Sequence, residues 1–157
     1  MKPAVYLEAS IISYLTAYQS RDVIVLARQK ITEDWWEHNR QKYELFVSDL
    51  VEQEASAGNV LMSKRRLKII KTLKNLATSE KAVELAEILV KRKAVPENSV
   101  ADALHIAIAT VEQMNFLLTW NFKHIANAQM QSKIEKVCRD EGFEPVTICT
   151  PEELLGE

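Results

Sequence analysis

The sequence is poor in the residues that build linkers and disulfide scaffolds. Among its 157 residues there are three glycines and four prolines, so long flexible linkers are not expected. The two cysteines, Cys138 and Cys149, show no CxxC spacing and no neighbouring histidine pattern. We therefore expect two reduced core thiols in a reducing compartment, and we expect no structural zinc site.

Long apolar runs and a strong charge of one sign are also lacking. No stretch is apolar over a length that spans a bilayer, and Met1-Lys2-Pro3 does not begin a signal peptide. No membrane association is expected, and the cytoplasm is the expected location. A net charge of −2 and an isoelectric point of about 6.0 exclude bulk attraction to nucleic acid, so any such contact must come from a local basic patch.

What is present fits a soluble globular domain. Hydrophobic residues make up 47% and charged residues 27%, and the length suits one domain over 1–157. Strands are predicted at 4–7, 45–47, 76–78, 116–119 and 146–148, and helices from Ser10, over 21–42, from Ser48 to Gly58, and over 60–74, 79–93, 99–113 and 127–140. This alternation predicts an α/β fold with a mostly parallel sheet and helices on both faces.

Polar side chains stand just after two of the predicted strands. Glu8 directly follows strand 4–7, and Asn121 follows strand 116–119 by two residues. In parallel α/β sheets, ligands bind beyond the carboxyl ends of the strands, where the strand order reverses. Glu8 and Asn121 are therefore candidates for a shared site, and the alternative is that each ends a strand in a solvated turn.

The helix predicted to begin at Ser99 is apolar on nearly all sides, which is typical of a buried helix. Asp102 near its start is costly to bury unless a partner or a metal ion compensates its charge. One interpretation is a capping box, in which Asp102 bonds back to the backbone of Ser99. The other is a metal-binding carboxylate near a helix N-terminus. His105 lies on the same helix face, where a histidine is more often a satisfied wall residue than a ligand.

Further charged residues follow the second predicted strand. Glu52 and Glu54 are two positions apart in a helix, so at most one of them faces a shared site. The basic stretch that comes next contains no acidic residue, and a helix there places Lys64, Lys68 and Lys71 on one face. Such a stripe can follow a phosphate backbone, or it can be a solvated face that aids solubility.

Two neighbouring tryptophans, Trp35 and Trp36, adjoin an amphipathic helix. Core or dimer packing is the first interpretation, and a base-stacking platform is the second. Motifs of other α/β enzymes are missing. No glycine-rich phosphate loop occurs, and Ser10 stands where an acid-x-acid phosphatase carries its second acid.

Four segments together resemble the PIN domain. They are VYLEAS at 5–10, VSDLVEQEA at 47–55, VADALHIA at 100–107 and LLTWNF at 117–122, and they occur in the family's order over nearly the whole chain. The resemblance implies a three-layer α/β/α sandwich whose acidic residues gather at the carboxyl edge of the sheet and hold Mg²⁺ or Mn²⁺. Many PIN domains are ribonucleases, including the toxins of VapC-type toxin–antitoxin pairs.

The resemblance also assigns site residues at the positions that match the family's pattern. These are the acids Glu8, Glu54 and Asp102, the small polar residue Ser10, the hydroxyl residue Thr119, and Asn121 in place of a fourth acid. Glu8 is one methylene longer than the usual Asp, and Asn121 lacks the usual charge, so the site holds three carboxylates at most. A divalent ion needs only one or two carboxylates besides waters and substrate phosphate, so one ion is compatible with this set.

Two hypotheses follow. The first is a metal-dependent endoribonuclease in which the three acids and Asn121 hold the ion, Ser10 and Thr119 orient its surroundings, and the lysine stripe follows the RNA. Its expected partners are RNA, an antitoxin protein and a second copy of the chain in a homodimer. The second hypothesis is a degenerate PIN domain that binds RNA or a protein partner without cleavage, which Asn121 favours.

Overall fold

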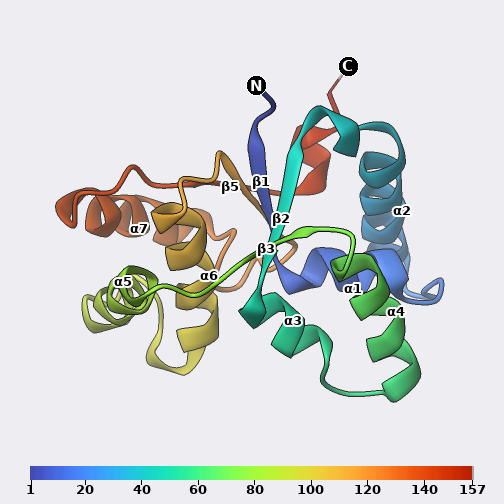
Figure 1. Cartoon of the computed structure of the whole chain (residues 1–157), viewed down its shortest axis with the longest axis horizontal. Helices are drawn as coiled ribbons and strands as arrows, with labels where there is room; N and C mark the ends of the chain where they lie inside the picture. Colours follow the sequence, from blue (N-terminus) through green and yellow to red (C-terminus); the bar gives the residue numbers. More distant parts are fainter. Residues whose placement is uncertain (157) are drawn as a thin grey trace.

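The computed structural model describes residues 1–156, and a five-stranded parallel sheet lies at its centre (Figure 1). The strands are β1 (Ala4–Leu7), β2 (Glu44–Ser48), β3 (Lys74–Leu76), β4 (Phe116–Leu118) and β5 (Thr147–Cys149). Their order is β3-β2-β1-β4-β5, and every neighbouring pair is parallel. The expected domain 1–157 includes Glu157, which lies outside the described residues.

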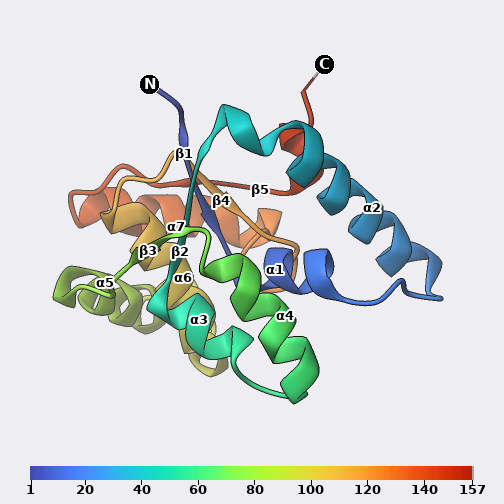
Figure 2. The same ribbon diagram turned by 45° about the vertical axis from the view of Figure 1, so that its right-hand side comes forward.

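Helices cover the sheet on both sides. They are α1 (Ala9–Thr16), α2 (Val23–His38), α3 (Asp49–Ala55), α4 (Val60–Ile70), α5 (Glu80–Lys91), α6 (Val100–Val111) and α7 (Ala128–Asp140), with short 3-10 turns η1 (Arg40–Lys42), η2 (Glu97–Ser99) and η3 (Pro151–Leu154). In both views α5, α6 and α7 lie together on one side of the strands, and α1, α2 and α4 lie on the other (Figures 1 and 2). The predicted α/β/α sandwich with a parallel sheet is confirmed.

The core centres on β1 and α6. Val5, Tyr6 and Leu7 have no exposed surface, because the central strand of a parallel sheet is covered on both faces. The helix α6 buries Ala103 and every residue from 105 to 110, which explains why its sequence is apolar on nearly all sides. Trp35 is fully buried and Trp36 packs against the core, so packing accounts for this pair.

The starts of two helices differ from the prediction. Glu8, not Ser10, is the N-cap of α1, and its carboxylate accepts the N–H of Ser10 at 3.1 Å. A carboxylate serves as a cap as well as a hydroxyl does, so the polar run allowed either residue. The capping box at the start of α6 is wrong, because Ser99 makes no side-chain cap bond and Asp102 binds residues of another segment.

Several element boundaries also shift by a few residues. The helix expected over 21–42 ends at His38 and is followed by η1. The helix expected over 60–74 ends at Ile70, because Lys74 already pairs with Phe46 as the first residue of β3, two residues before the predicted strand. Helix ends depend on tertiary pairing of the residues that follow, which local periodicity does not report.

Both cysteines are buried free thiols, as predicted. Burial raises the pKa of Cys138, and it raises the pKa of Cys149 to about 12. Over residues 1–156, no helix combines the length and the apolar character that a membrane crossing requires.

Candidate active site

The carboxyl ends of β1 and β4 meet where the strand order reverses, and Glu8 stands at this point. Its Oε1 accepts hydrogen bonds from the hydroxyls of Ser10 at 2.5 Å and Thr119 at 2.6 Å, and its Oε2 accepts the N–H of Ser10. Only 6% of Glu8 is exposed. Three donors therefore hold a nearly buried carboxylate in one orientation without neutralising its charge.

Ser10 and Thr119 are fixed in turn by the backbone that follows β4. The N–H of Trp120 donates to Ser10 Oγ, and the N–H of Asn121 donates to Thr119 Oγ1, both at 2.9 Å. Each hydroxyl thus accepts one backbone hydrogen and gives its own hydrogen to Glu8. The structure brings Glu8, Ser10 and Thr119 together, and their part in catalysis stays a prediction.

Glu54 reaches the same region from α3 through a buried hydrogen-bond chain. Its Oε1 lies 2.5 Å from Nε2 of His105, a residue with no exposed surface. Nδ1 of His105 lies 2.7 Å from the Tyr6 hydroxyl, which lies 2.8 Å from Ser48 Oγ. Ser48 Oγ also accepts the N–H of Val51 and so caps α3, as predicted. This chain ties the strand end of β2 to the Glu54 carboxylate.

When the imidazole of His105 is neutral, the hydrogens along this chain have one consistent arrangement. A carboxylate only accepts, so Nε2 of His105 carries the hydrogen of the bond to Glu54. Burial raises the pKa of Tyr6 far above its ordinary value, with the charges of Glu8 and Glu54 adding to the effect, so the Tyr6 hydroxyl keeps its hydrogen. The hydroxyl of Ser48 then donates to Tyr6, and Tyr6 donates to Nδ1 of His105.

Glu52 points away from this chain. Its Oε2 accepts a hydrogen bond from Nδ2 of Asn75 in β3 at 3.3 Å. The two glutamates therefore point in different directions, as helix geometry predicts for residues two positions apart, and only Glu54 bonds to His105.

Asp102 enters from the first turn of α6. Its Oδ1 accepts a hydrogen bond from Nδ2 of Asn121 at 3.0 Å, and its Oδ2 lies 3.2 Å from Nδ1 of His124. Oδ1 of Asn121 accepts the N–H of His124, and the Ser99 hydroxyl lies 2.8 Å from the same His124 nitrogen. Both ends of the Asn121 amide are thus engaged with protein groups. His124 is a contact of the site that the sequence did not reveal, because a lone histidine in a loop carries no pattern.

The donor set fits a divalent cation. Ligand atoms of Glu8, Glu54 and His105 all lie within 4.8 Å of one another. In the described part of the chain no Lys or Arg forms an ion pair with Glu8, Glu54 or Asp102, whose ion-pair contacts are only to histidines. Carboxylates held this close repel one another, and carboxylate oxygens are the donors that Mg²⁺ and Mn²⁺ prefer.

Within this donor set, His105 orients a ligand rather than offering a free nitrogen. Both of its ring nitrogens are engaged, by Glu54 and by Tyr6. A histidine of this kind fixes the rotamer of a neighbouring carboxylate and acts on an ion through it. This agrees with the interpretation of His105 as a satisfied wall residue.

Neither a protein-family model nor a curated protein matches the sequence. Solved structures do match. VapBC2 from Rickettsia felis, bound to a DNA fragment from its promoter, superposes with a TM-score of 0.59 at 14% identity and covers 94% of this chain and 98% of the other. VapC20 from Mycobacterium tuberculosis, a sarcin–ricin loop cleaving toxin, gives 0.58 at 12% identity over 82% and 94%. VapBC-1 from nontypeable Haemophilus influenzae gives 0.56 at 16% identity over 94% and 98%.

The chain has a VapC-type PIN fold. At these identities the likeness concerns the fold alone, and it confirms the architecture that the four sequence segments predicted. The residues assigned to the PIN site lie at the carboxyl edge of this fold, at the cap and first turn of α1, on α3 and α6, and on the segment after β4. Their chemistry follows from the contacts described above.

Lys64 and Lys68 of the predicted lysine stripe lie on α4, and Lys71 is the C-cap residue of this helix, which packs beside α1 and α3 (Figure 2). Lys64, Lys68 and Lys71 are all exposed and form no ion pair within residues 1–156. Arg66 has a different task, since its guanidinium donates to the carbonyls of Ala55 and Ala57 and fastens α4 to the end of α3. No described hydrogen bond connects the stripe to the carboxylates.

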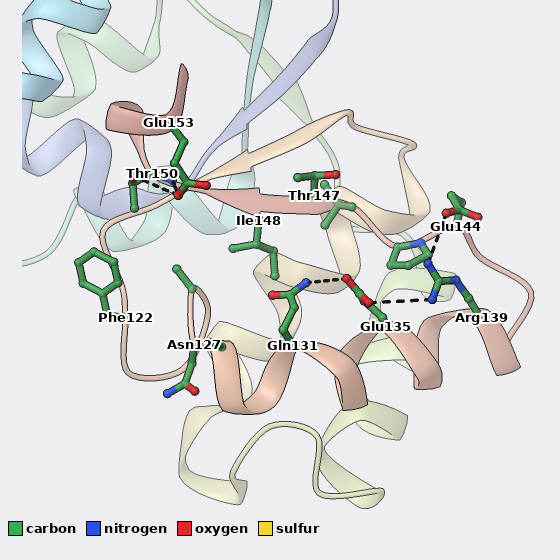
Figure 3. A pocket seen from close by; sticks show the side chains of 14 residues that line it. Phe122, Asn127, Gln131, Glu135, Arg139, Glu144, Thr147, Ile148, Thr150 and Glu153 are labelled. Atoms are coloured by element: carbon green, nitrogen blue, oxygen red, sulfur yellow. Dashed lines mark hydrogen bonds and ion pairs between the residues drawn. The ribbon is translucent and has the colours of Figure 1, made fainter. Parts of the chain in front are cut away.

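A cavity of about 590 Å³ lies between β5 and α7, apart from the carboxylates (Figure 3). Phe122 stands at one end of it, and Arg139 and Glu144 stand at the other. Glu135 and Glu153 also line the cavity, so its walls carry more negative than positive charge. The cavity and the carboxylate site share the loop that follows β4.

Proposed function

We propose that this protein is a metal-dependent ribonuclease that hydrolyses RNA phosphodiester bonds. One observation carries the proposal. Glu8 and Glu54 come within a few ångströms of each other at the carboxyl edge of the sheet, and Asp102 is connected to Glu8 through Asn121 and Thr119. Within residues 1–156 no lysine or arginine pairs with these carboxylates. The VapC-type fold supports it, because one structural neighbour, VapC20, is a sarcin–ricin loop cleaving toxin.

In this proposal Glu8, Glu54 and Asp102 hold Mg²⁺ or Mn²⁺, with Asn121 beside Asp102. A bound ion of this kind lowers the pKa of a water and neutralises charge on the phosphate. The protein's contribution is orientation. Ser10 and Thr119 hold the Glu8 carboxylate through short hydrogen bonds, and His105 holds Glu54. Carboxylates that are already fixed in place lose little freedom when they bind the ion and the substrate.

The substrate strand needs a cationic path, since the carboxylates repel it before an ion is bound. We assign this role to Lys64 and Lys68 of α4 and to its C-cap residue Lys71, which are exposed and unpaired in the described structure. Removing one phosphate-contacting lysine is expected to weaken binding of all RNA sequences about equally and to reduce its salt dependence.

We further propose that the protein is the toxin of a toxin–antitoxin pair and acts in the cytoplasm as a homodimer. The support is that two of the similar structures are VapBC complexes. An antitoxin protein would then be its partner, and co-expression with the product of a neighbouring gene tests this through growth rescue and co-purification.

A second candidate function is a PIN-type protein that binds RNA or a protein partner without cleavage. Asn121 favours it, because an amide stands where the family usually has an acid and both ends of this amide are engaged. Titration with Mn²⁺ separates the two functions. A nuclease takes up the ion at this site, whereas a pure binder does not need to.

The deciding experiment is cleavage of a mixed single-stranded RNA with Mn²⁺, with Mg²⁺ and with EDTA. We expect metal-dependent products with 5′-phosphates from the parent protein and none from Asp102→Asn at an unchanged melting temperature. The matched control is Asp34→Asn. Asp34 is an exposed aspartate on α2 that lies 3.6 Å from His38 one turn away, and this variant is expected to cleave like the parent. Full cleavage by the Asp102→Asn variant would contradict the assignment of Asp102 as a metal ligand.

A further inference from the structure

An aromatic pair lies directly beside the candidate site. Trp120 and Phe122 flank Asn121, and their rings meet edge to face with centroids 6.0 Å apart. Trp120 is buried, and its Nε1–H donates to Thr32 Oγ1 at 2.8 Å, whereas Phe122 is 43% exposed. A fixed buried ring therefore supports an exposed one, and an exposed aromatic side chain with few rotamers loses little entropy when a ligand covers it.

Arg28 of α2 completes this surface. Its Cζ lies 5.0 Å from the ring centroid of Phe122 and 5.7 Å from that of Trp120. Within residues 1–156 the guanidinium forms no ion pair. The cation–π contact thus holds the charge beside the rings and leaves its N–H donors available, and a guanidinium matches the geometry of phosphate oxygens.

We propose that Phe122 and Arg28 form a nucleotide subsite next to the carboxylates. The exposed ring stacks on an unpaired base, and the guanidinium contacts a phosphate of the same strand. The subsite rests on the proposed ribonuclease function, since it would hold the nucleotide beside the bond that is cut. Phe122 follows Asn121 in the chain, and Asn121 bonds directly to Asp102, so the subsite and the carboxylates share one short segment.

The surroundings of Phe122 favour stacking without selection of one base. The ring borders the cavity between β5 and α7, which has room for a base (Figure 3). Both ends of the Asn127 amide are engaged with backbone groups, and the Gln131 amide nitrogen donates to Glu135. Three of the four heteroatoms of these two amides are therefore engaged within the protein, and stacking alone accepts every base. The acidic cavity wall repels phosphate, which places the phosphate on the Arg28 side of the ring.

Binding in EDTA tests the subsite separately from cleavage. The probes are a fluorescent oligouridylate of about ten nucleotides and an abasic ribose-phosphate strand of the same length, and anisotropy gives the Kd of each. The parent is expected to prefer the strand that carries bases. Phe122→Leu is expected to weaken oligouridylate binding by roughly five- to a hundredfold and to leave the abasic strand almost unchanged. Phe122→Tyr keeps an aromatic face and is expected to bind like the parent.

Arg28→Gln is expected to weaken both strands and to reduce the slope of log Kd against log salt by about 0.7. The matched control is Arg40→Gln. Arg40 lies in η1, before β2 and away from the carboxyl edge of the sheet, and its Cζ lies 4.3 Å from the ring centroid of Trp36. This variant is expected to bind like the parent. Circular dichroism melting shows that each variant is folded before it is compared.

Equal losses for the two strands in Phe122→Leu, or no loss for either, would overturn the stacking subsite. So would a loss in Arg40→Gln as large as that in Arg28→Gln. These outcomes are distinct from failure of the nuclease proposal. A parent that cleaves RNA in Mn²⁺ without a preference for bases overturns the subsite alone. A parent that binds bases through Phe122 but cleaves nothing in Mn²⁺ overturns the nuclease and supports the subsite.

Discussion

Replacing Thr119 with valine removes two hydrogen bonds and almost no volume. Thr119 has no exposed surface, and its hydroxyl donates to Glu8 Oε1 at 2.6 Å while it accepts the N–H of Asn121 at 2.9 Å. Valine fills the same space but can neither donate nor accept. The change therefore isolates what the hydroxyl contributes to holding the site, because packing around the side chain is kept.

The expected loss follows from the two bonds. A hydrogen bond to a charged group contributes about 1.5–3 kcal/mol, and a buried N–H left without a partner costs about 1–3 kcal/mol. Asn121 is only partly buried, so water can satisfy its N–H in part, and the cost of the unpaired N–H falls toward the lower end of its range. We expect the free energy of unfolding to drop by about 2–4 kcal/mol, a large share of the ~5–15 kcal/mol of a typical domain.

Urea unfolding in EDTA measures this loss, and the chain offers a matched control. Thr110 is 2% exposed, and within residues 1–156 its hydroxyl has no hydrogen-bond partner of normal geometry and lies beside the weakly polar Cys138 thiol. Thr110→Val is expected to change stability by less than about 0.5–1 kcal/mol. Thr119→Ser keeps the hydroxyl and is expected to lose only the methyl contribution, about 1 kcal/mol. Equal losses in the two Thr→Val variants would refute the assigned role of the Thr119 hydroxyl.

Three further changes have defined outcomes. Tyr6→Phe removes the hydrogen bond to His105 and loosens Glu54, so Mn²⁺ affinity measured by calorimetry is expected to fall by about tenfold or more. An unchanged affinity would contradict the role of the Tyr6–His105–Glu54 hydrogen bonds. Because burial raises the pKa of Cys149 to about 12, the unfolded chain ionises first. The contribution of the Cys149 thiol to the free energy of unfolding is fully present below about pH 8.5. It is lost between about pH 8.5 and 12, by at most about 1.4 kcal/mol per pH unit, and Cys149→Ala is expected to flatten that slope in urea unfolding. Asp22→Ala removes the cap of α2 and is expected to cost about 1 kcal/mol in the same assay, whereas no loss would mean that the cap is replaced by water.

Local sequence patterns predicted the fold class more accurately than they predicted the boundaries of its elements. Strand 4–7 was predicted to the residue, because a short apolar run that ends at a charged residue has only one register in a buried parallel strand. The strand β3 was predicted two residues late, since its backbone pairs with β2 and its side chains show little burial pattern. Pairing partners that lie far away in sequence decide such short edge strands.

For the candidate site, the sequence identified residues but not the contacts between them. The sequence offered Glu8, Glu54 and Asp102 as candidates and limited Glu52 and Glu54 to one inward-facing residue, because helix geometry alone excludes the pair. It did not reveal which donors hold each carboxylate. Ser10 and Thr119 meet on Glu8 although 109 positions separate them, and His124 reaches Asp102 from a loop without a pattern.

The sequence by itself determined the fold class, the order of its elements and the residues able to carry acidic chemistry, because periodicity and side-chain type are local properties. Only the tertiary structure decided which of those residues meet. The reversal of strand order at β1 brings Glu8 next to the segment after β4, and His105 of α6, which bonds to Tyr6 of β1, meets Glu54 of α3. It also placed the Arg28 guanidinium over the Phe122 ring, a contact between a helix and a loop that no spacing in the chain encodes.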